Sequence, residues 1–171
     1  MEDPPLKDIQ TLHAQLRDQM KAEHKRQVSF GDLISDRWEN AKAYDFGEGT
    51  SCYDNVLIIG NVKVGKNTWI GPNVILDGSG DLEIGDFCSI SAGVQIYTHD
   101  TVEWSTSLGE ASTDKNPTRI GSGVYIGPQT VIQKGVTIGD KAVIGACSFV
   151  NSDIPAGARA WGTPVKVQSD K

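Results

Sequence analysis

The sequence has no long hydrophobic run, few cysteines and no excess of basic residues. Its longest apolar stretches, such as residues 56–59, are far too short to span a bilayer. The first five residues include two prolines and two acidic side chains and do not resemble a signal peptide. We therefore expect a cytoplasmic protein without membrane insertion.

Cysteine content and charge exclude further classes of protein. Cys52, Cys88 and Cys147 are odd in number and lack the close pairs of a zinc site or a disulfide framework. We expect these thiols to be reduced and expect no bound metal. The net charge of -6 leaves no surplus of lysine and arginine to neutralise phosphates, which argues against a nucleic-acid partner.

The N-terminal region has helical patterns. Between residues 6 and 27, apolar side chains recur at steps of three and four among charged ones, which is typical of an amphipathic helix. These side chains are Leu6, Ile9, Leu12, Leu16 and Met20. Ser29, with Asp32 three residues later, resembles a helix start, and a second short helix is expected through Trp38 to about Tyr44.

A sixfold repeat begins at Cys52. Every sixth residue is aliphatic, apart from that first cysteine, a slip of two residues at 78–81 and a long break at 99–118. The repeated positions are Cys52, Ile58, Val64, Ile70, Leu76, Ile84, Ile90, Ile96, Ile120, Ile126, Ile132, Ile138, Ile144 and Val150. Half of them are followed by glycine, which tolerates the turn conformations that such short strands need.

This period predicts a parallel β-helix of hexapeptide repeats from Cys52 to about Pro155, in which stacked coils share one core. The alternative is a β-sandwich, but sandwich strands alternate with a period of two and have turns of variable length. We expect residues 1–48 to form a helical segment, 49–155 the β-helix and 156–171 a C-terminal tail. In this register Cys52 and Cys88 point inward and Cys147 points outward.

The third residue after each aliphatic position is typical of an exposed corner, with many asparagines and glycines. His99 takes this place after Ile96, so its imidazole is predicted to point outward. It also begins the long interruption at 99–118, and long loops that leave a repeat often serve binding. From the residues alone, a functional histidine and a solvated surface histidine remain equally open.

Three segments carry a resemblance to a known family. Residues 138–146, followed by the Asp-Ile-Pro of 153–155 and the Gly-Thr-Pro-Val-Lys of 162–166, resemble the hexapeptide-repeat acyltransferases. The similar members are the galactoside, maltose and nodulation O-acetyltransferases and related polysaccharide acetyltransferases. This resemblance covers about residues 58–166. It implies an all-β fold, a left-handed parallel β-helix of between four and five coils, and a homotrimer with acetyl-CoA between neighbouring coils.

The resemblance also implies a catalytic base. In that family a histidine follows a strand that here is Ile96-Tyr97-Thr98, which makes His99 the expected general base. The sugar acetyltransferases have two more residues before the histidine, so the loop must pack differently here. Glu110, eleven residues later, is expected to position the imidazole or the acceptor.

Further roles follow from the same resemblance. Residues expected to line the coenzyme site are Tyr125, Pro128, Ala146, Asn151, Ser152 and Lys166, with Lys166 facing the phosphates. Asp77 corresponds to an acceptor-binding aspartate of the maltose-type enzymes, and Trp104 is expected to shape the acceptor pocket. The expected reaction is acetyl transfer from acetyl-CoA to a hydroxyl of a carbohydrate.

Three other functions remain as alternatives. An N-acetyltransferase acting on a nucleotide-linked amino sugar shares the scaffold and the coenzyme. A γ-type carbonic anhydrase needs three histidines for its zinc, but His13 and His24 fall on the predicted N-terminal helix and leave only His99 in the repeats. A non-enzymatic scaffold predicts no coenzyme binding.

Overall fold

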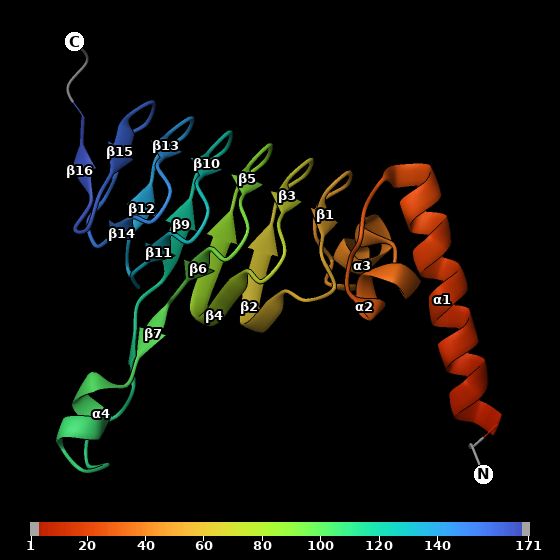
Figure 1. Cartoon of the computed structure of the whole chain (residues 1–171). Helices are drawn as coiled ribbons and strands as arrows, with labels where there is room; N and C mark the ends of the chain where they lie inside the picture. The colour runs from red at the N-terminus through yellow and green to blue at the C-terminus, as the bar shows by residue number, and fades with distance from the viewer. Residues whose placement is uncertain (1–3, 169–171) are drawn as a thin grey trace.

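The computed structural model describes residues 4–168, which form a solenoid of short parallel strands with helices at its N-terminal end (Figure 1). Each coil has three sides. The first side, face A, contains β1 (Ser51–Cys52), β3 (Trp69–Ile70), β5 (Ser89–Ile90), β10 (Tyr125–Ile126), β13 (Val143–Ile144) and β15 (Arg159–Trp161). An antiparallel strand, β16 (Lys166–Val167), closes this side at the C-terminal end.

Two long strands turn the corner between the other two sides. The first halves of β2 (Leu57–Val64) and β4 (Ile75–Ile84) form face B together with β6 (Gln95–Ile96), β11 (Val131–Ile132) and β14 (Phe149–Val150). Their second halves form face C with β9 (Thr118–Ile120) and β12 (Thr137–Ile138). The architecture is consistent with the expected left-handed β-helix of hexapeptide repeats.

The solenoid is longer than expected. Six parallel strands stack on face A, so the chain completes about six turns rather than the predicted four to five. The difference arises because β15 lies beyond the last predicted repeat and places a buried alanine, Ala160, at the inward position. A search for large aliphatic residues does not find such a repeat.

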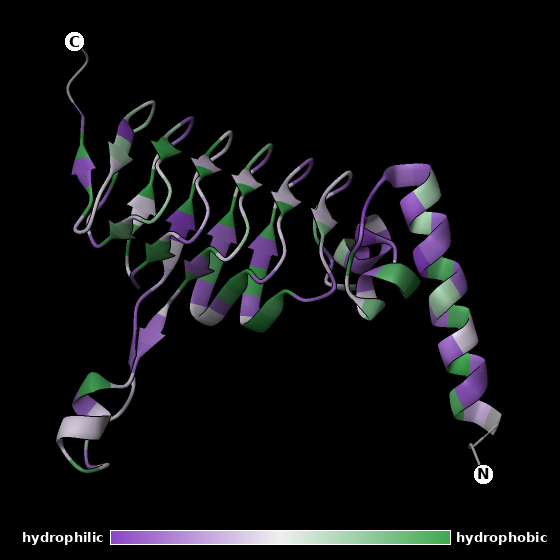
Figure 2. Ribbon diagram, in the orientation of Figure 1, coloured by the Kyte–Doolittle hydropathy of each residue, from purple (hydrophilic) through white to green (hydrophobic). Residues whose placement is uncertain are grey.

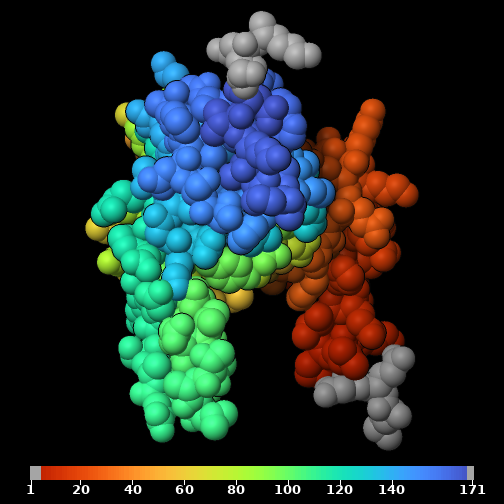
Figure 3. Space-filling model, turned by 90° about the vertical axis from the view of Figure 1, so that its left-hand side faces the viewer, coloured from red at the N-terminus to blue at the C-terminus, as the bar shows by residue number. Residues whose placement is uncertain are grey.

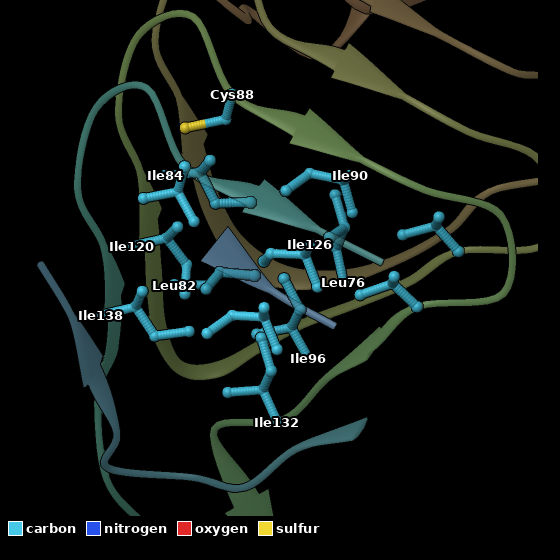
Figure 4. Packing of buried hydrophobic residues seen from close by; sticks show 14 of the residues in the cluster. Leu76, Leu82, Ile84, Cys88, Ile90, Ile96, Ile120, Ile126, Ile132 and Ile138 are labelled. Carbon is cyan, nitrogen blue, oxygen red and sulfur yellow. The ribbon is translucent and has the colours of Figure 1, made fainter. Parts of the chain in front are cut away.

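The predicted inward positions make up the core. Thirteen of the fourteen are buried, and Ile58 is partly buried against the same cluster. Figure 2 shows hydrophobic residues recurring at the same place in successive coils, and Figure 4 shows the aliphatic side chains meeting in the narrow interior. Cys52 and Cys88 are buried and Cys147 is exposed, as the register predicts.

The corner residues explain the asparagines and glycines in the repeat. Asn67, Asn73, Gln129 and Lys141 have φ between 53° and 60°, in the left-handed region that most residues avoid. All four lie at the third place after an inward aliphatic residue. The prediction that this place is an exposed corner is therefore confirmed.

The N-terminal helices cover the open end of the solenoid (Figure 1). They are α1 (Pro4–His24), α2 (Phe30–Ile34) and α3 (Arg37–Ala43). Ser29 caps α2 as expected, and Asp36 caps α3. Asn40 donates hydrogen bonds to the carbonyl oxygens of Cys52 and Tyr53, which fixes α3 to the first coil. Ala41 is buried there, so α3 protects the first layer of the core.

The predicted interruption forms an arm, residues 99–116, that projects from the solenoid (Figures 1 and 3). Its base is an antiparallel pair, β7 (His99–Asp100) and β8 (Asp114–Lys115), and its tip contains α4 (Val102–Thr106). In Figure 3 the arm and α1 extend in the same direction on opposite sides of the molecule. No helix within residues 4–168 has an apolar stretch long enough to cross a bilayer.

Candidate active site

His99 and Asp77 form a close pair at the base of the arm. The Nδ1 atom of His99 lies 2.6 Å from Oδ2 of Asp77. The carboxylate is 1% exposed, whereas the imidazole is 30% exposed. His99 therefore opens to the outside, as its register predicts, and a buried anion supports it from behind.

The slip of two residues in the repeat builds the carboxylate's surroundings. At the slip, β4 bulges against β2, between the pairs Gly60 with Gly78 and Val62 with Leu82. The bulge directs the amide of Ser79 to Oδ1 of Asp77 at 3.0 Å. From the next coil, the amide of Thr98 donates to Oδ2 at 2.9 Å. The irregularity in the sequence is thus the feature that holds Asp77.

Thr98 ties the bulge to the arm. Its buried hydroxyl donates to the carbonyl oxygen of Asp77 at 2.8 Å and accepts from the amide of Gly80 at 2.8 Å. Its carbonyl oxygen accepts from the amide of Asn116, where the arm returns to the solenoid, at 2.8 Å. A side chain at Gly80 has no room, because its Cβ would lie 2.5 Å from the carbonyl oxygen of Thr98.

Gly80→Ala is expected to lower the free energy of unfolding by about 1–3 kcal/mol, since the methyl group must displace backbone rather than a flexible side chain. Urea denaturation with an unchanged m-value is the measurement. Lys63→Ala is the comparison variant, because Lys63 is exposed on face C away from the bulge. Equal unfolding midpoints for Gly80→Ala and the wild type would contradict this packing.

The environment of Asp77 favours its charged form. Burial alone raises the pKa of this carboxyl, but hydrogen bonds from Ser79, Thr98 and His99 outweigh burial and hold the pKa below its ordinary range. An ionised carboxylate can only accept hydrogen bonds, so Nδ1 of His99 must be the donor in their contact. The lone pair of the neutral ring is therefore on Nε2, which is the atom able to accept a proton.

A shallow cavity of about 270 Å³ lies in front of His99 on face B. Tyr97, Val131 and Phe149 give it an apolar wall, and Gln133 and Lys134 add polar groups. These side chains come from three neighbouring coils, because β6, β11 and β14 pair in register. The cavity can hold an extended, mostly apolar chain against the imidazole.

Lys134 fastens the base of the arm. Its Nζ atom contacts the carboxylates of Asp100 on β7 and Asp114 on β8. The hydrogen bond from Lys134 holds the pKa of Asp100 below its usual range, and the same contact raises the pKa of Lys134. Lys134 therefore links both arm strands, in addition to their backbone pairing and the hydrogen bond from Asn116 to Thr98.

Lys134→Met is expected to increase hydrogen exchange in residues 99–116 by about tenfold or more, because two neighbouring carboxylates then repel each other without a cation between them. Exchange measured by mass spectrometry tests this directly. Lys63→Met, an exposed lysine on face C, should leave the arm unchanged. Unchanged exchange in both variants would show that Lys134 does not hold the arm.

The expected coenzyme residues fall into two groups. Tyr125, Pro128, Ala146 and Lys166 lie on face A or at the corner that follows it, and the amide of Cys147 bonds to Pro128 there. Asn151 and Ser152 directly follow β14, beside the His99 cavity. Lys166 also lies near the second group, because the amide of its neighbour Val165 bonds to the carbonyl oxygen of Phe149 on β14. The coenzyme role of all six residues stays a prediction.

The expected role of Glu110 at the imidazole is not supported within the chain. Glu110 lies in the turn after α4, at the tip of the arm, and its amide bonds to Ser107. Asp77 occupies the place beside the ring instead. Trp104 in α4 is half exposed at the same tip. Neither residue lines the His99 cavity.

Sequence reasoning missed Thr98 and Lys134. Thr98 is an ordinary small residue beside the histidine, and its hydroxyl finds its hydrogen-bond partners only on the bulge of the preceding coil. For Lys134 a signal existed, because it is a lysine at a corner two residues after the inward Ile132, close to the break in the repeat. No cluster of three histidine, cysteine or acidic side chains within residues 4–168 could hold a metal ion.

Comparison with known proteins identifies the repeats. Residues 117–152 match the model of the bacterial transferase hexapeptide family (six repeats), and residues 61–98 match that of the hexapeptide repeat of succinyl-transferase. Both matched segments lie in the solenoid, whose coils are similar to transferase hexapeptide repeats. The recognition made from the sequence is confirmed, and so is the fold class.

Relatives of this hexapeptide-repeat protein include the galactoside O-acetyltransferase of Escherichia coli, 36% identical over 63% of the chain and 53% of the relative. Nodulation protein L of Rhizobium meliloti is 37% identical over 63% of the chain and 59% of the relative. The chain thus spans less than two thirds of these relatives. A hexapeptide-repeat acetyltransferase of Vibrio cholerae, solved with acetyl-CoA, is 26% identical, with a TM-score of 0.69 over 99% of this chain and 92% of that one.

Proposed function

We propose that this protein is an acetyl-CoA-dependent acetyltransferase that moves an acetyl group to a hydroxyl of a sugar or a polysaccharide precursor. The observation that carries the proposal is the 2.6 Å pair of His99 and Asp77 at an apolar cavity on a transferase-type solenoid. The similar Vibrio cholerae protein binds acetyl-CoA, and the Escherichia coli relative acts on galactosides.

His99 is the general base in this proposal. Its Nε2 takes the proton of the acceptor hydroxyl as that oxygen attacks the carbonyl carbon of the thioester. A C–O bond forms, the C–S bond breaks, and the imidazolium returns the proton to the sulfur of coenzyme A. Asp77 stabilises the imidazolium and fixes its tautomer, so we assign it a positioning role. This role replaces the acceptor-binding role implied by the resemblance, because the carboxylate is buried and both its oxygens are engaged.

The residues present suit a coenzyme A thioester. The apolar wall of the His99 cavity is suited to the extended pantetheine arm, and Lys166 is an exposed cation able to contact phosphates. Tyr125, Pro128 and Ala146 lie together on another side of the solenoid. We place the coenzyme between two chains, the arrangement that the resemblance implies, where residues from different sides of the solenoid can meet.

A homotrimer supplies the second chain. The outward row on face B is apolar at four of five positions, and Leu57 in it is 52% exposed; the row is Leu57, Ile75, Gln95, Val131 and Phe149. The corresponding row on face C is charged and includes Lys63, Glu83 and Arg119. Burial of face B against other copies is therefore favoured over burial of face C. In such an assembly Trp104 and Glu110 on the arm would reach the acceptor site of a neighbouring chain.

A panel of acceptors tests the proposal. Purified protein is incubated with acetyl-CoA and either hydroxyl or amino sugars, and release of the coenzyme thiol is followed together with product mass. Acetylation of a hydroxyl acceptor supports O-acetyl transfer. Exclusive acetylation of amines would favour the N-acetyltransferase. Absence of coenzyme binding in calorimetry would overturn the proposal and favour the non-enzymatic scaffold.

A further inference from the structure

A second cavity, of about 440 Å³, lies on face A between α3 and the first three coils. Its wall contains three aromatic rings, from Trp38, Tyr53 and Trp69, and two arginines, Arg26 and Arg37. Arg26 and Tyr53 also line two adjoining cavities, so the hollow continues around the junction of α1 and α2. Its volume is within the range of pockets that bind small molecules.

Arg37 is held in place by aromatic stacking. Its guanidinium carbon lies 5.1 Å from the ring centre of Trp38 and 4.8 Å from that of Tyr53. Stacking uses the flat faces of the guanidinium and leaves its N–H edge available for a planar or tetrahedral anion. Because Asn40 fastens α3 to the strand that precedes Tyr53, this cation is fixed before any ligand arrives.

The cavity is cationic although the protein is acidic. In the described part of the chain, arginines form ion pairs at Arg17 with Asp18 and at Arg119 with Glu83, and neither pair lies here. The wall of the 440 Å³ cavity contains two arginines and no carboxylate, whereas Asp32 and Asp36 line an adjoining cavity, where both accept hydrogen bonds from backbone amides. In a chain with a net charge of -6, this local excess of positive charge favours an anionic ligand.

The remaining wall suits a sugar ring. The indole of Trp69 is 65% exposed, so its flat face is free to stack against the C–H groups of a pyranose. Ser51, Ser89 and Ser91 add hydroxyl groups along the same strands. An exposed indole beside a fixed guanidinium can bind a carbohydrate that carries a negative charge.

The cavity also continues towards the expected coenzyme residues. The outward positions Ser51, Trp69, Ser89 and Tyr125 are register partners on neighbouring strands of face A. Tyr125 is thus directly beside the last strand of the cavity. A ligand seated on Trp69 would have its far end near Tyr125, one of the residues expected to line the coenzyme site.

We propose that this cavity binds the acceptor and selects a carbohydrate bearing an anionic group, with the ring on Trp69 and the anion at Arg37 and Arg26. Binding of an anionic carbohydrate is inferred from the cavity alone. The statement that the bound carbohydrate is the acetyl acceptor rests on the proposed function.

Calorimetric titration of the full chain with defined probes tests the binding. The probes are methyl glucuronide for a carboxylate, glucose 1-phosphate for a phosphate, methyl glucoside as the neutral sugar, and inorganic phosphate. We expect at least one anionic sugar to bind about tenfold or more tightly than the neutral sugar, and the better of the two identifies the anion. Equal affinity for charged and neutral sugars would overturn the proposal. So would inorganic phosphate binding as tightly as glucose 1-phosphate, because the ring would then contribute nothing.

Variants locate the site. Trp69→Ala and Arg37→Gln should each weaken binding of the preferred anionic sugar about tenfold, and Arg37→Gln should also remove the preference over the neutral sugar. Trp69 is exposed, so its loss should not disturb folding, and Phe87→Ala, an aromatic residue 62% exposed elsewhere, is the matched control. Wild-type affinity in both test variants would overturn the placement.

Acetyl transfer is measured separately with the probe that binds. A probe that binds through Trp69 and Arg37 but is never acetylated would contradict the acceptor role. It would still support the binding of an anionic sugar in this cavity. Efficient acetylation of neutral sugars without any anionic preference would contradict the charge selection and leave the acetyltransferase standing. The two failures are therefore distinguishable.

Discussion

Replacing His99 with asparagine is expected to lower kcat for acetyl transfer by about 10²–10⁴-fold, because the only atom placed to accept the acceptor's proton is lost. The measurement is steady-state kinetics with acetyl-CoA and an acceptor that the wild type acetylates. Asparagine keeps a donor at the position of Nδ1, so the hydrogen bond to Asp77 can persist and folding should be retained. The KM for acetyl-CoA should change little, since the loss belongs to the transition state.

Lys63→Asn is the control for this variant. Lys63 is exposed on face C and lines neither the His99 cavity nor the cavity at Trp69. Its replacement should leave kcat unchanged. If the His99 variant retained kcat within about tenfold of the wild type, His99 would not be the base, and the proposed mechanism would fail while the coenzyme site could stand.

Asp77→Asn is expected to lower kcat by about 10–100-fold while leaving the chain folded. The amide oxygen can still accept from His99, but it carries no charge to stabilise the imidazolium that forms during the reaction. The amide can also present its nitrogen to the ring and favour the wrong tautomer. A loss in kcat without a matching rise in KM for the acceptor would support a positioning role. A rise in the acceptor's KM alone would restore the acceptor-binding role.

The same substitution has a signature in stability against pH. The pKa of Asp77 is lower in the fold than in the unfolded chain, where it is about 3.9. Its contribution to stability is therefore present above the unfolded pKa and is lost as the pH falls towards the lower folded value. The variant should lose less stability than the wild type between about pH 5 and pH 3. Asp18→Asn, an exposed aspartate on α1, should follow the wild-type curve.

The fold was predictable because the same inward aliphatic position recurs in coil after coil. An aliphatic residue every sixth position can be buried by one regular geometry only, and the corner residues tolerate the positive φ that this geometry needs. The prediction fell short where the pattern used small residues. Ala160 on β15 is fully buried at an inward position although its side chain is a single methyl group.

The site was predictable only in part. The register was sufficient to turn His99 outward, since its direction depends on its distance from Ile96. Glu110 was expected to position the imidazole or the acceptor, but within the chain the contact with the ring is made by Asp77, and the role of Glu110 stays a prediction. Asp77 lies 22 residues before His99 and reaches it through the stacking of one coil on the next. A slip of two residues in a repeat does not reveal which way the bulged backbone will turn.

The sequence by itself determined the β-helix, the inward and outward sides of its coils and the exposed direction of His99, because these follow from local periodicity. Only the tertiary structure decided that Asp77 supports the imidazole, that Lys134 holds the arm and that Arg37 faces a cavity with Trp69. Those contacts join residues from different coils or from the N-terminal helices. Their geometry depends on how bulges, caps and arms pack, and no repeat in the sequence encodes that packing.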